Sequence, residues 1–382
     1  MDLIFSVGTY LHDLFISRLH TFPLYIVVAL FIMLFCIIGI IELLTYLVIG
    51  RISSFYLRKR DSNIEERIIT MLANVLVFGD DNADPKAVVA HFVPRFTRLP
   101  LYRPSIRRIL VSKLLNNNSN FSGRTSEILR ELYLQLKLDK RARKSLRSRP
   151  WCEQIEAIRE LTQMSVRDEC DIILKHTNDR NPQLRLEAQV AYIRLCSDNP
   201  FRFLDTIREP LLEYHQIILF GVITKSETMA RPRFSFWLNS KKDSVVLLSL
   251  KLIEYYQQFD ALPNLIYLIN HYNPAIRGYA IDILGRMEAE MAESHLVAAY
   301  PIQPLKIKIK ILQTLGLIAS GSCLSFLNSQ AKNKEFPIRI AALRAIKAHR
   351  KDGQELLTTL FNEGAGQDKA IIRHVLDERI KI

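Results

Sequence analysis

The stretch LKHTNDRNPQLRLEAQVAYIRL, Leu174–Leu195, indicates the fold of this 382-residue chain. It reads as the end of one apolar helix, a polar turn from Asn178 to Asn181, and a second helix that begins with Pro182. Proline suits a first helical turn because its φ is already helical and its missing N–H needs no partner there. Arg185 follows three residues later, and small alanines then allow close helix approach. The stretch predicts a helix–turn–helix unit.

The same pattern recurs towards the C-terminus. One copy is LINHYNPAIRGYAIDILGRM, with Pro274 and Arg277, and another is QAKNKEFPIRIAALRAIKAH, with Pro337 and Arg339. Weaker copies surround Ser244 and Pro304, and residues 209–223 depart from the pattern. A helix pair of about 30 residues cannot bury its apolar side alone, so repeated pairs stack on one another. We therefore expect an all-α fold in which residues 151–382 form an α-α superhelical solenoid.

These units resemble the HEAT-repeat family, in which a Pro or Asp at the inter-helix turn and an Arg early in the second helix recur. Two copies fit that signature directly, and the third fits with a one-residue shift. The resemblance implies an architecture and says almost nothing about activity. The signature positions, to which we assign a structural role, are Pro182 and Arg185, Pro274 and Arg277, and Pro337 and Arg339.

The chain consists, in order, of an N-terminal apolar segment, a basic helical region, the short sequence Arg149–Ile155, and the repeats. This order resembles that of uncharacterised membrane-anchored HEAT-repeat proteins of Bacteroidota. The resemblance implies a connection with envelope or polysaccharide-synthesis machinery. A signalling protein is an alternative partner.

The segment Leu24–Ile49 is long and apolar enough to cross a membrane, and Glu42 is its only charged residue. A cleaved signal peptide fits less well, because the apolar run is long and no small-residue cleavage site follows. We expect a short interfacial or extracytoplasmic segment over 1–22 and a transmembrane helix over 23–50. Glu42 either is protonated or reaches the interface, or it contacts another transmembrane helix. Its role stays open.

Charge on the two flanks predicts the orientation of that helix. Only Arg18 precedes it, whereas Arg51, Arg58, Lys59 and Arg60 follow it closely. Positive residues favour the cytoplasmic side. We therefore expect a single-pass protein of the inner (cytoplasmic) membrane, with its N-terminus outside and its repeats in the cytoplasm.

The net charge of +13 is concentrated in residues 86–150, which hold 16 Lys or Arg against three Asp or Glu. This stretch dominates a basic helical juxtamembrane region over 51–150, in which atypical repeats are an open alternative. It fits a solvated surface, anionic lipid headgroups or an acidic protein partner. Nucleic acid fits less well because few aromatic residues lie between the charges. The candidate contacts are Arg141, Arg143, Lys144, Arg147 and Arg149.

No catalytic signature is present among the motifs for nucleotide binding, metalloproteases or serine hydrolases. The nine histidines are scattered, and the carboxylates Asp168, Glu169 and Asp171 read as an exposed acidic first turn. The five cysteines include no CxxC pair, which predicts buried, unpaired thiols in a reducing compartment rather than a disulfide framework. We expect no catalytic residue, no metal and no cofactor.

These observations favour a membrane-anchored scaffold that binds protein partners through its helical-repeat surface. One alternative is a tethered factor that binds nucleic acid or anionic lipid through 86–150. A second is an enzyme built on a HEAT-like fold, since such folds host some enzymes. The identity of the partner, the repeat face that binds it, the oligomeric state and the pathway stay open.

Overall fold

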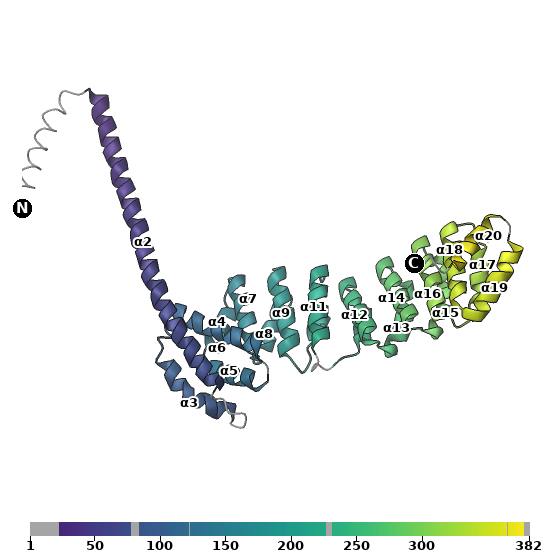
Figure 1. Ribbon diagram of the computed structural model, residues 1–382, viewed down its shortest axis with the longest axis horizontal. Coiled ribbons are helices and arrows are strands. Elements are labelled where there is room, and N and C mark those ends of the chain that lie inside the picture. The colour runs from purple at the N-terminus through teal and green to yellow at the C-terminus, as the bar shows by residue number, and fades with distance from the viewer. Residues whose placement is uncertain (1–22, 78–83, 122, 227–230, 365, 378–382) are drawn as a thin grey trace, which may run out of the picture. The chain divides into compact units, whose positions relative to one another are not determined.

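The computed structural model describes residues 23–77, 84–121, 123–226, 231–364 and 366–377. Over these residues the chain forms helices and turns and no strand, which confirms the all-α prediction (Figure 1). The chain divides into two compact units, Met1–Leu138 and Asp139–Ile382. The interfacial segment expected over 1–22 lies outside the described residues.

The first unit is organised around one continuous helix, α2 (Leu24–Val77). Its C-terminal half buries Ile68, Leu72 and Val75 against α3 (Pro85–Thr97) and α4 (Pro104–Asn120). The helix α5 (Arg124–Gln135) completes the core. Both α3 and α4 begin with proline, as expected where the first N–H needs no partner.

The N-terminal half of α2 carries the apolar stretch that the sequence analysis singled out. Within the described residues, Phe31–Ile49 has a mean hydropathy of 2.6 and is long enough to cross a membrane. None of that stretch is buried by the rest of the protein. A signal sequence near an N-terminus has the same character, so length and composition alone do not separate the two.

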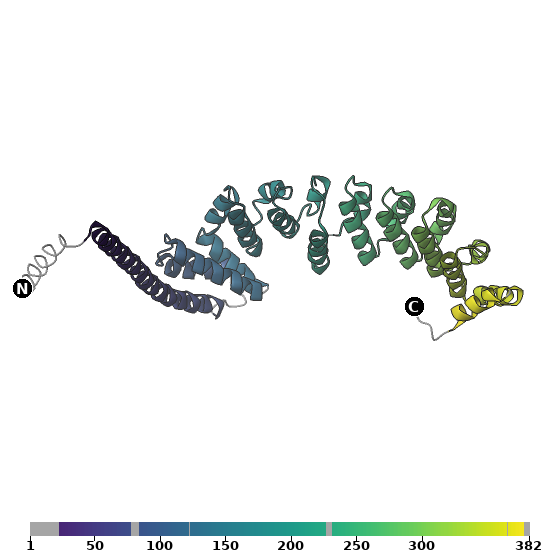
Figure 2. The same cartoon turned by 90° about the horizontal axis from the view of Figure 1, so that it is seen from above.

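The second unit is a row of stacked helix pairs (Figures 1 and 2). Successive long helices lie side by side, so each buries an apolar side against its neighbours. They are α7 (Trp151–Gln163), α9 (Pro182–Leu195), α11 (Glu213–Lys225), α12 (Asp243–Tyr256), α14 (Pro274–Arg286), α16 (Leu305–Ile318), α18 (Phe336–Ala348) and α20 (Gln367–Leu376).

A companion helix, usually shorter, precedes each long one and forms the second layer of the row. These helices are α6 (Asp139–Leu146), α8 (Cys170–His176), α10 (Arg202–Asp205), η1 (Phe234–Asn239), α13 (Leu262–Tyr267), α15 (Glu293–Ala299), α17 (Leu324–Ala331) and α19 (Arg350–Glu363). Short 3-10 turns flank α13 and α15: η2 (Phe259–Ala261), η3 (Leu268–Asn270), η4 (Glu290–Ala292) and η5 (Tyr300–Ile302).

The signature arginines fasten the inter-helix turns. Arg185 Nη1 donates to the Asp179 carbonyl at 2.7 Å, and Arg277 Nη1 donates to the His271 carbonyl at 2.8 Å. In both repeats the acceptor lies six residues earlier, in the turn or helix end that precedes the long helix. An asparagine before the proline caps each helix through its side chain. The two copies therefore share one local structure.

The third copy differs because its helix begins one residue before the proline. Phe336 is the first residue of α18 and Pro337 is the second, so Arg339 still occupies the fourth position. Its Nη1 donates to Asp368 of α20 at 3.1 Å rather than to the preceding turn. In this copy the proline therefore occupies the second helical position instead of the first, and the arginine occupies the fourth position in all three copies.

The cysteines correct an expectation. Cys170 and Cys196 form a disulfide, with their Cα atoms 6.0 Å apart. The hairpin of α8 and α9 brings the first residue of α8 beside the residue that follows α9, which sequence spacing does not reveal. Cys36 and Cys152 are exposed and only Cys323 is a buried thiol. The prediction of five buried, unpaired thiols is therefore wrong.

Candidate protein-binding surface

Two of the five basic candidates from the sequence, Arg143 and Arg147, form ion pairs with carboxylates. Arg143 donates to Asp139 at 2.8 Å, Asp168 at 2.8 Å and Glu169 at 2.9 Å. Arg147 donates to the other oxygen of the buried Glu169 at 2.8 Å. Hydrogen bonds to Asp168, and then to Glu169 and Asp139, hold the pKa of Arg143 above its usual value despite partial burial. These charges join α6 to the start of α8.

The remaining three basic candidates, Arg141, Lys144 and Arg149, are exposed. None of them has an ion-pair partner among the described residues. The sequence predicted that Asp168, Glu169 and Asp171 form an exposed acidic turn. In the structure Glu169 is only 6% exposed, and it forms ion pairs with two arginines. Among the described residues, the three basic candidates and the exposed Lys140 are therefore cations of α6 and its C-terminal turn without an ion pair.

Ion pairs connect most neighbouring long helices of the row. Their members lie 28 to 32 residues apart, which is the length of one repeat, so each repeat contributes one partner. The pairs are Arg159 with Glu187 (α7 and α9), Arg286 with Glu254 (α12 and α14), Lys310 with Asp282 (α14 and α16), and Arg339 with Asp368 (α18 and α20).

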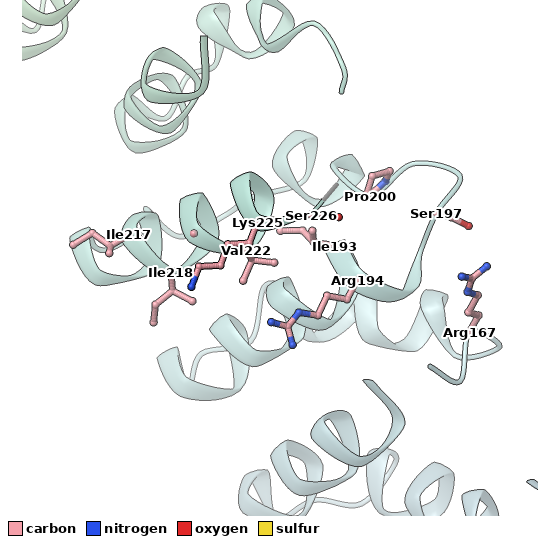
Figure 3. Close-up of a pocket in the computed structure, with 11 residues that line it drawn as sticks. Arg167, Ile193, Arg194, Ser197, Pro200, Ile217, Ile218, Val222, Lys225 and Ser226 are labelled. Carbon is pink, nitrogen blue, oxygen red and sulfur yellow. The ribbon is translucent and has the colours of Figure 1, made fainter. Parts of the chain in front are cut away.

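The α9–α11 interface shows no such pair among the described residues and contains a cavity instead. Its volume is about 720 Å³. Figure 3 shows Arg194, from α9, lying across the space from Val222 and Ile218 of α11, with Arg167 at the far end. Lys225 lies on the α11 side. We call this cavity the α9–α11 groove; its other lining residues are Ile193, Ser197, Pro200, Ile217, Gly221 and Ser226.

The groove is positively charged. Arg167, Arg194 and Lys225 are exposed, and no Asp or Glu is among the described residues that line it. Arg194 lies seven residues after Glu187 and so projects from the same side of α9 as the ion pair with Arg159. The α11–α12 and α16–α18 interfaces also show no ion pair among the described residues, so the groove is distinguished by the combination of exposed cations with open space.

Apolar side chains form the rest of its wall. Ile217 is 68% exposed and Ile218 is 42% exposed, although both belong to a helix in the middle of the row. A Cβ built on Gly221 would meet nothing within 4 Å. The helices α9 and α11 thus leave space beside α11 between Ile217 and Lys225.

A second, shallower depression lies on the other side of α11. Its volume is about 510 Å³, and Phe220, Lys251 and Tyr255 line it. Ile217 lines both cavities. Lys251 Nζ donates to Gln216 at 3.3 Å, so its charge is partly satisfied. The exposed surface therefore continues across α11 onto α12.

The sequence analysis missed this groove. Its three cations are scattered in the chain, and none belongs to a motif. They are 27 and 31 residues apart, close to the repeat period, and this spacing was the one available signal. No group of three or more His, Cys, Asp or Glu side chains in the described part of the chain could hold a metal ion.

The chain matches no protein-family model and no curated protein sequence. Among solved structures it is similar to Kap121p bound to Nup53p, with 14% identity over 82% of this chain and a TM-score of 0.35. It spans only 37% of that karyopherin's length. Human deoxyhypusine hydroxylase in complex with glycerol is 15% identical over 75% of this chain and 97% of that one, with a TM-score of 0.29. Likenesses at these TM-scores carry no argument about function.

Proposed function

We propose that this chain is a membrane-anchored scaffold that binds protein partners through the long-helix side of its repeat row. One observation carries the proposal: the α9–α11 groove combines exposed isoleucines with cations that have no ion-pair partner among the described residues. Exposed apolar surface with polar groups beside it is characteristic of interaction sites. The described residues of the lining include no carboxylate or histidine that could act as a base, which supports binding over catalysis.

The anchor is the exposed apolar stretch Phe31–Ile49 of α2. The basic residues that follow it support a cytoplasmic repeat row in the inner membrane, with the N-terminus outside. The Cys170–Cys196 disulfide supports the opposite orientation, because disulfides persist in oxidising compartments. We retain the cytoplasmic orientation, since flanking charge acts on the insertion step itself.

Cys152 can report the orientation because it is exposed and lies outside the disulfide. A membrane-impermeant maleimide is applied to sealed vesicles of each orientation, with Cys152→Ser as the control. Labelling only in inside-out vesicles supports cytoplasmic repeats. Labelling only in right-side-out vesicles contradicts that placement and agrees with the disulfide.

The resemblance noted in the sequence supports envelope or polysaccharide-synthesis machinery as the setting, with signalling machinery as an alternative. The test is a crosslinking pull-down from gently solubilised membranes, in which the full chain is compared with a chain that ends at Leu138, the last residue of the first compact unit. Specific proteins recovered only with the repeats support the scaffold. Recovery of only lipid or nucleic acid contradicts it.

A second candidate function is contact with an anionic membrane surface through Arg141, Lys144 and Arg149. It is favoured by their exposure and by the absence of ion-pair partners among the described residues. Each basic residue near an anionic leaflet contributes about 1 kcal/mol, and salt weakens the effect. Flotation with vesicles that contain phosphatidylserine measures it: replacing all three residues with Ala should abolish a salt-sensitive fraction of binding by a chain whose α2 apolar stretch is removed.

A further inference from the structure

We infer that the α9–α11 groove receives an acidic peptide segment of a partner protein, one that carries apolar side chains beside its carboxylates. This inference rests on the proposed scaffold function and names the chemistry of the partner. Three observations on the described residues support it: the groove contains exposed cations, it exposes apolar side chains, and it has enough volume for a peptide.

Interfaces within one row differ in how their cations are paired. Where α12 meets α14 and where α14 meets α16, the cations Arg286 and Lys310 each meet a carboxylate from the neighbouring repeat. At the groove, Arg194 and Lys225 have no such carboxylate among the described residues. An incoming carboxylate would therefore supply the partner that the α12–α14 and α14–α16 interfaces supply internally. Arginine also binds carboxylates through two parallel hydrogen bonds, which would add geometric specificity.

The helix α11 presents apolar side chains to the groove. Ile217 and Ile218 are exposed, and Val222 faces the groove one turn further along. A ligand made only of charge, such as a phosphate or a sugar phosphate, would leave these side chains in water. Burying them gives a favourable contribution that only an apolar group can provide. The occupant must therefore offer both kinds of group.

The available space favours an elongated occupant. The groove itself has a volume of about 720 Å³, and Ile217 joins it to the depression that Phe220 and Tyr255 line on the other side of α11. A peptide segment can cross α11 and use both hollows. Gly221 keeps the crossing open, since no side chain fills its position.

The same surface fits a single-stranded nucleic acid poorly. Bases stack on free aromatic faces, but Phe220 and Tyr255 pack edge to face against each other, with ring centroids 5.5 Å apart. The cations of the groove are accompanied by aliphatic rather than aromatic side chains. An acidic peptide is therefore the occupant that the observations favour.

The first test is photo-crosslinking in the full-length, membrane-bound chain. The photoreactive residue p-benzoylphenylalanine is placed at Val222 in the groove or at Gln313, an exposed position on α16. Crosslinked peptides are identified by mass spectrometry. We expect Val222 to capture a segment rich in Asp or Glu and in apolar residues. Crosslinks from Gln313 but not from Val222 would leave the scaffold standing and overturn the groove inference, whereas specific crosslinks from neither would overturn both.

Variants then test the charges. In the chain carrying the photoreactive residue at Val222, Arg194→Glu with Lys225→Glu should reduce the crosslink at least tenfold. The matched control, Lys175→Glu with Arg180→Glu, changes the charge equally at two exposed positions outside the groove and should leave the crosslink unchanged. Thermal unfolding confirms that both double variants are folded. An unchanged crosslink in the groove variant would overturn the inference, as would capture of RNA or lipid at Val222.

A direct binding measurement removes dependence on the native partner. The probe is a fluorescein-labelled 14-residue peptide with leucines at helical spacing and glutamates elsewhere, and its comparison peptide has glutamine in place of every glutamate. We expect fluorescence anisotropy with the full chain in detergent to show at least tenfold tighter binding of the glutamate peptide. Gly221→Leu should fill the groove and abolish that preference in a folded chain. Equal binding of the two peptides would contradict the inference.

Discussion

The α16–α18 interface and the α9–α11 interface each include a glycine of a long helix. The helices approach closely at the first glycine and leave open space at the second. Gly316 of α16 lies so close to α18 that an added Cβ would stand 2.8 Å from the Cα of Ala345. Gly221 of α11 has nothing within 4 Å of that position. A glycine brings helices together only when the facing residue is also small. Ala345 is small, whereas α9 presents Ile193 and Arg194 to the groove.

One buried ionisable group in each region has a different environment. Glu293 at the start of α15 is 3% exposed and accepts hydrogen bonds from the Ser320 hydroxyl at 2.6 Å, from the Ser320 N–H and from the Ser322 hydroxyl. His215 at the start of α11 is fully buried, and neither ring nitrogen has a well-formed hydrogen-bond partner among the described residues. The C-terminal repeats also contain such atoms in the described part of the chain, including Tyr300 Oη and His349 Nε2. The difference between the two regions therefore lies in how closely Gly316 and Gly221 are approached by the facing helix.

The largest expected effect on stability comes from removing the Cys170–Cys196 disulfide, which joins α8 to the end of α9. A crosslink that closes a loop of this sequence separation, 26 residues, stabilises the folded state by about 3.5 kcal/mol through the unfolded chain. Cys170→Ser with Cys196→Ser should lower the free energy of unfolding by about that amount, measured by urea denaturation. Reductant should do the same to the unmodified chain and nothing further to the double variant. Cys152→Ser is the control and should have no effect.

The next effect concerns the close contact. Gly316→Val should destabilise the chain by about 3 kcal/mol, because its side chain would displace the backbone of α18. Gly221→Val introduces the same residue into open space and should change stability by less than about 0.5 kcal/mol. Equal losses in the two variants, measured by thermal unfolding, would show that the two interfaces do not differ as described.

Acidification should affect the two regions in separate pH ranges. Burial, with the nearby Arg185, lowers the pKa of His215, so the folded state holds this ring neutral. The unfolded chain takes up its proton near pH 6.5, so stability that is present above about pH 6.5 is lost as the pH falls from there towards the folded pKa. His215→Gln should remove this dependence, as measured by unfolding between pH 7.5 and 5. His295→Gln, at an exposed position, should not.

Glu293 should respond only at lower pH. Burial raises its pKa, but hydrogen bonds from Ser320 and Ser322 outweigh this effect and hold the pKa below its usual value. Its contribution is therefore complete above about pH 4.5 and is lost as the pH falls through the folded pKa. Glu293→Gln should flatten the stability profile below pH 4.5 and leave the range governed by His215 unchanged. A loss confined to pH 5–6.5 would contradict the assignment.

The smallest expected effect is a gain. Gly221→Ala replaces a poor helix former by the best one at a position with open space, and should stabilise the chain by about 0.5–1 kcal/mol. Gly316→Ala should instead destabilise it, because Ala345 leaves no room. Opposite signs in these two variants, measured by differential scanning calorimetry, would give the sharpest form of the comparison.

Local sequence determined much of the architecture, because its signals act within one or two helical turns. Pro182 and Pro274 begin long helices as expected, and the arginine that follows each fastens the preceding turn. The shifted copy around Pro337 was also recognised, although only the helix boundary at Phe336 explains the shift. The apolar run within α2 was evident from composition alone.

Contacts between residues about one repeat apart in the chain were determined only by the tertiary structure. Sequence grouped Arg143 and Arg147 with three other basic residues, whereas the packing of α6 against the start of α8 directs these two to carboxylates. The pairing of Cys170 with Cys196 and the collection of Arg167, Arg194 and Lys225 around one cavity have the same origin. Helical periodicity predicts that helices will stack. The spacing between them depends on how facing side chains fit, and only the folded chain brings those side chains together.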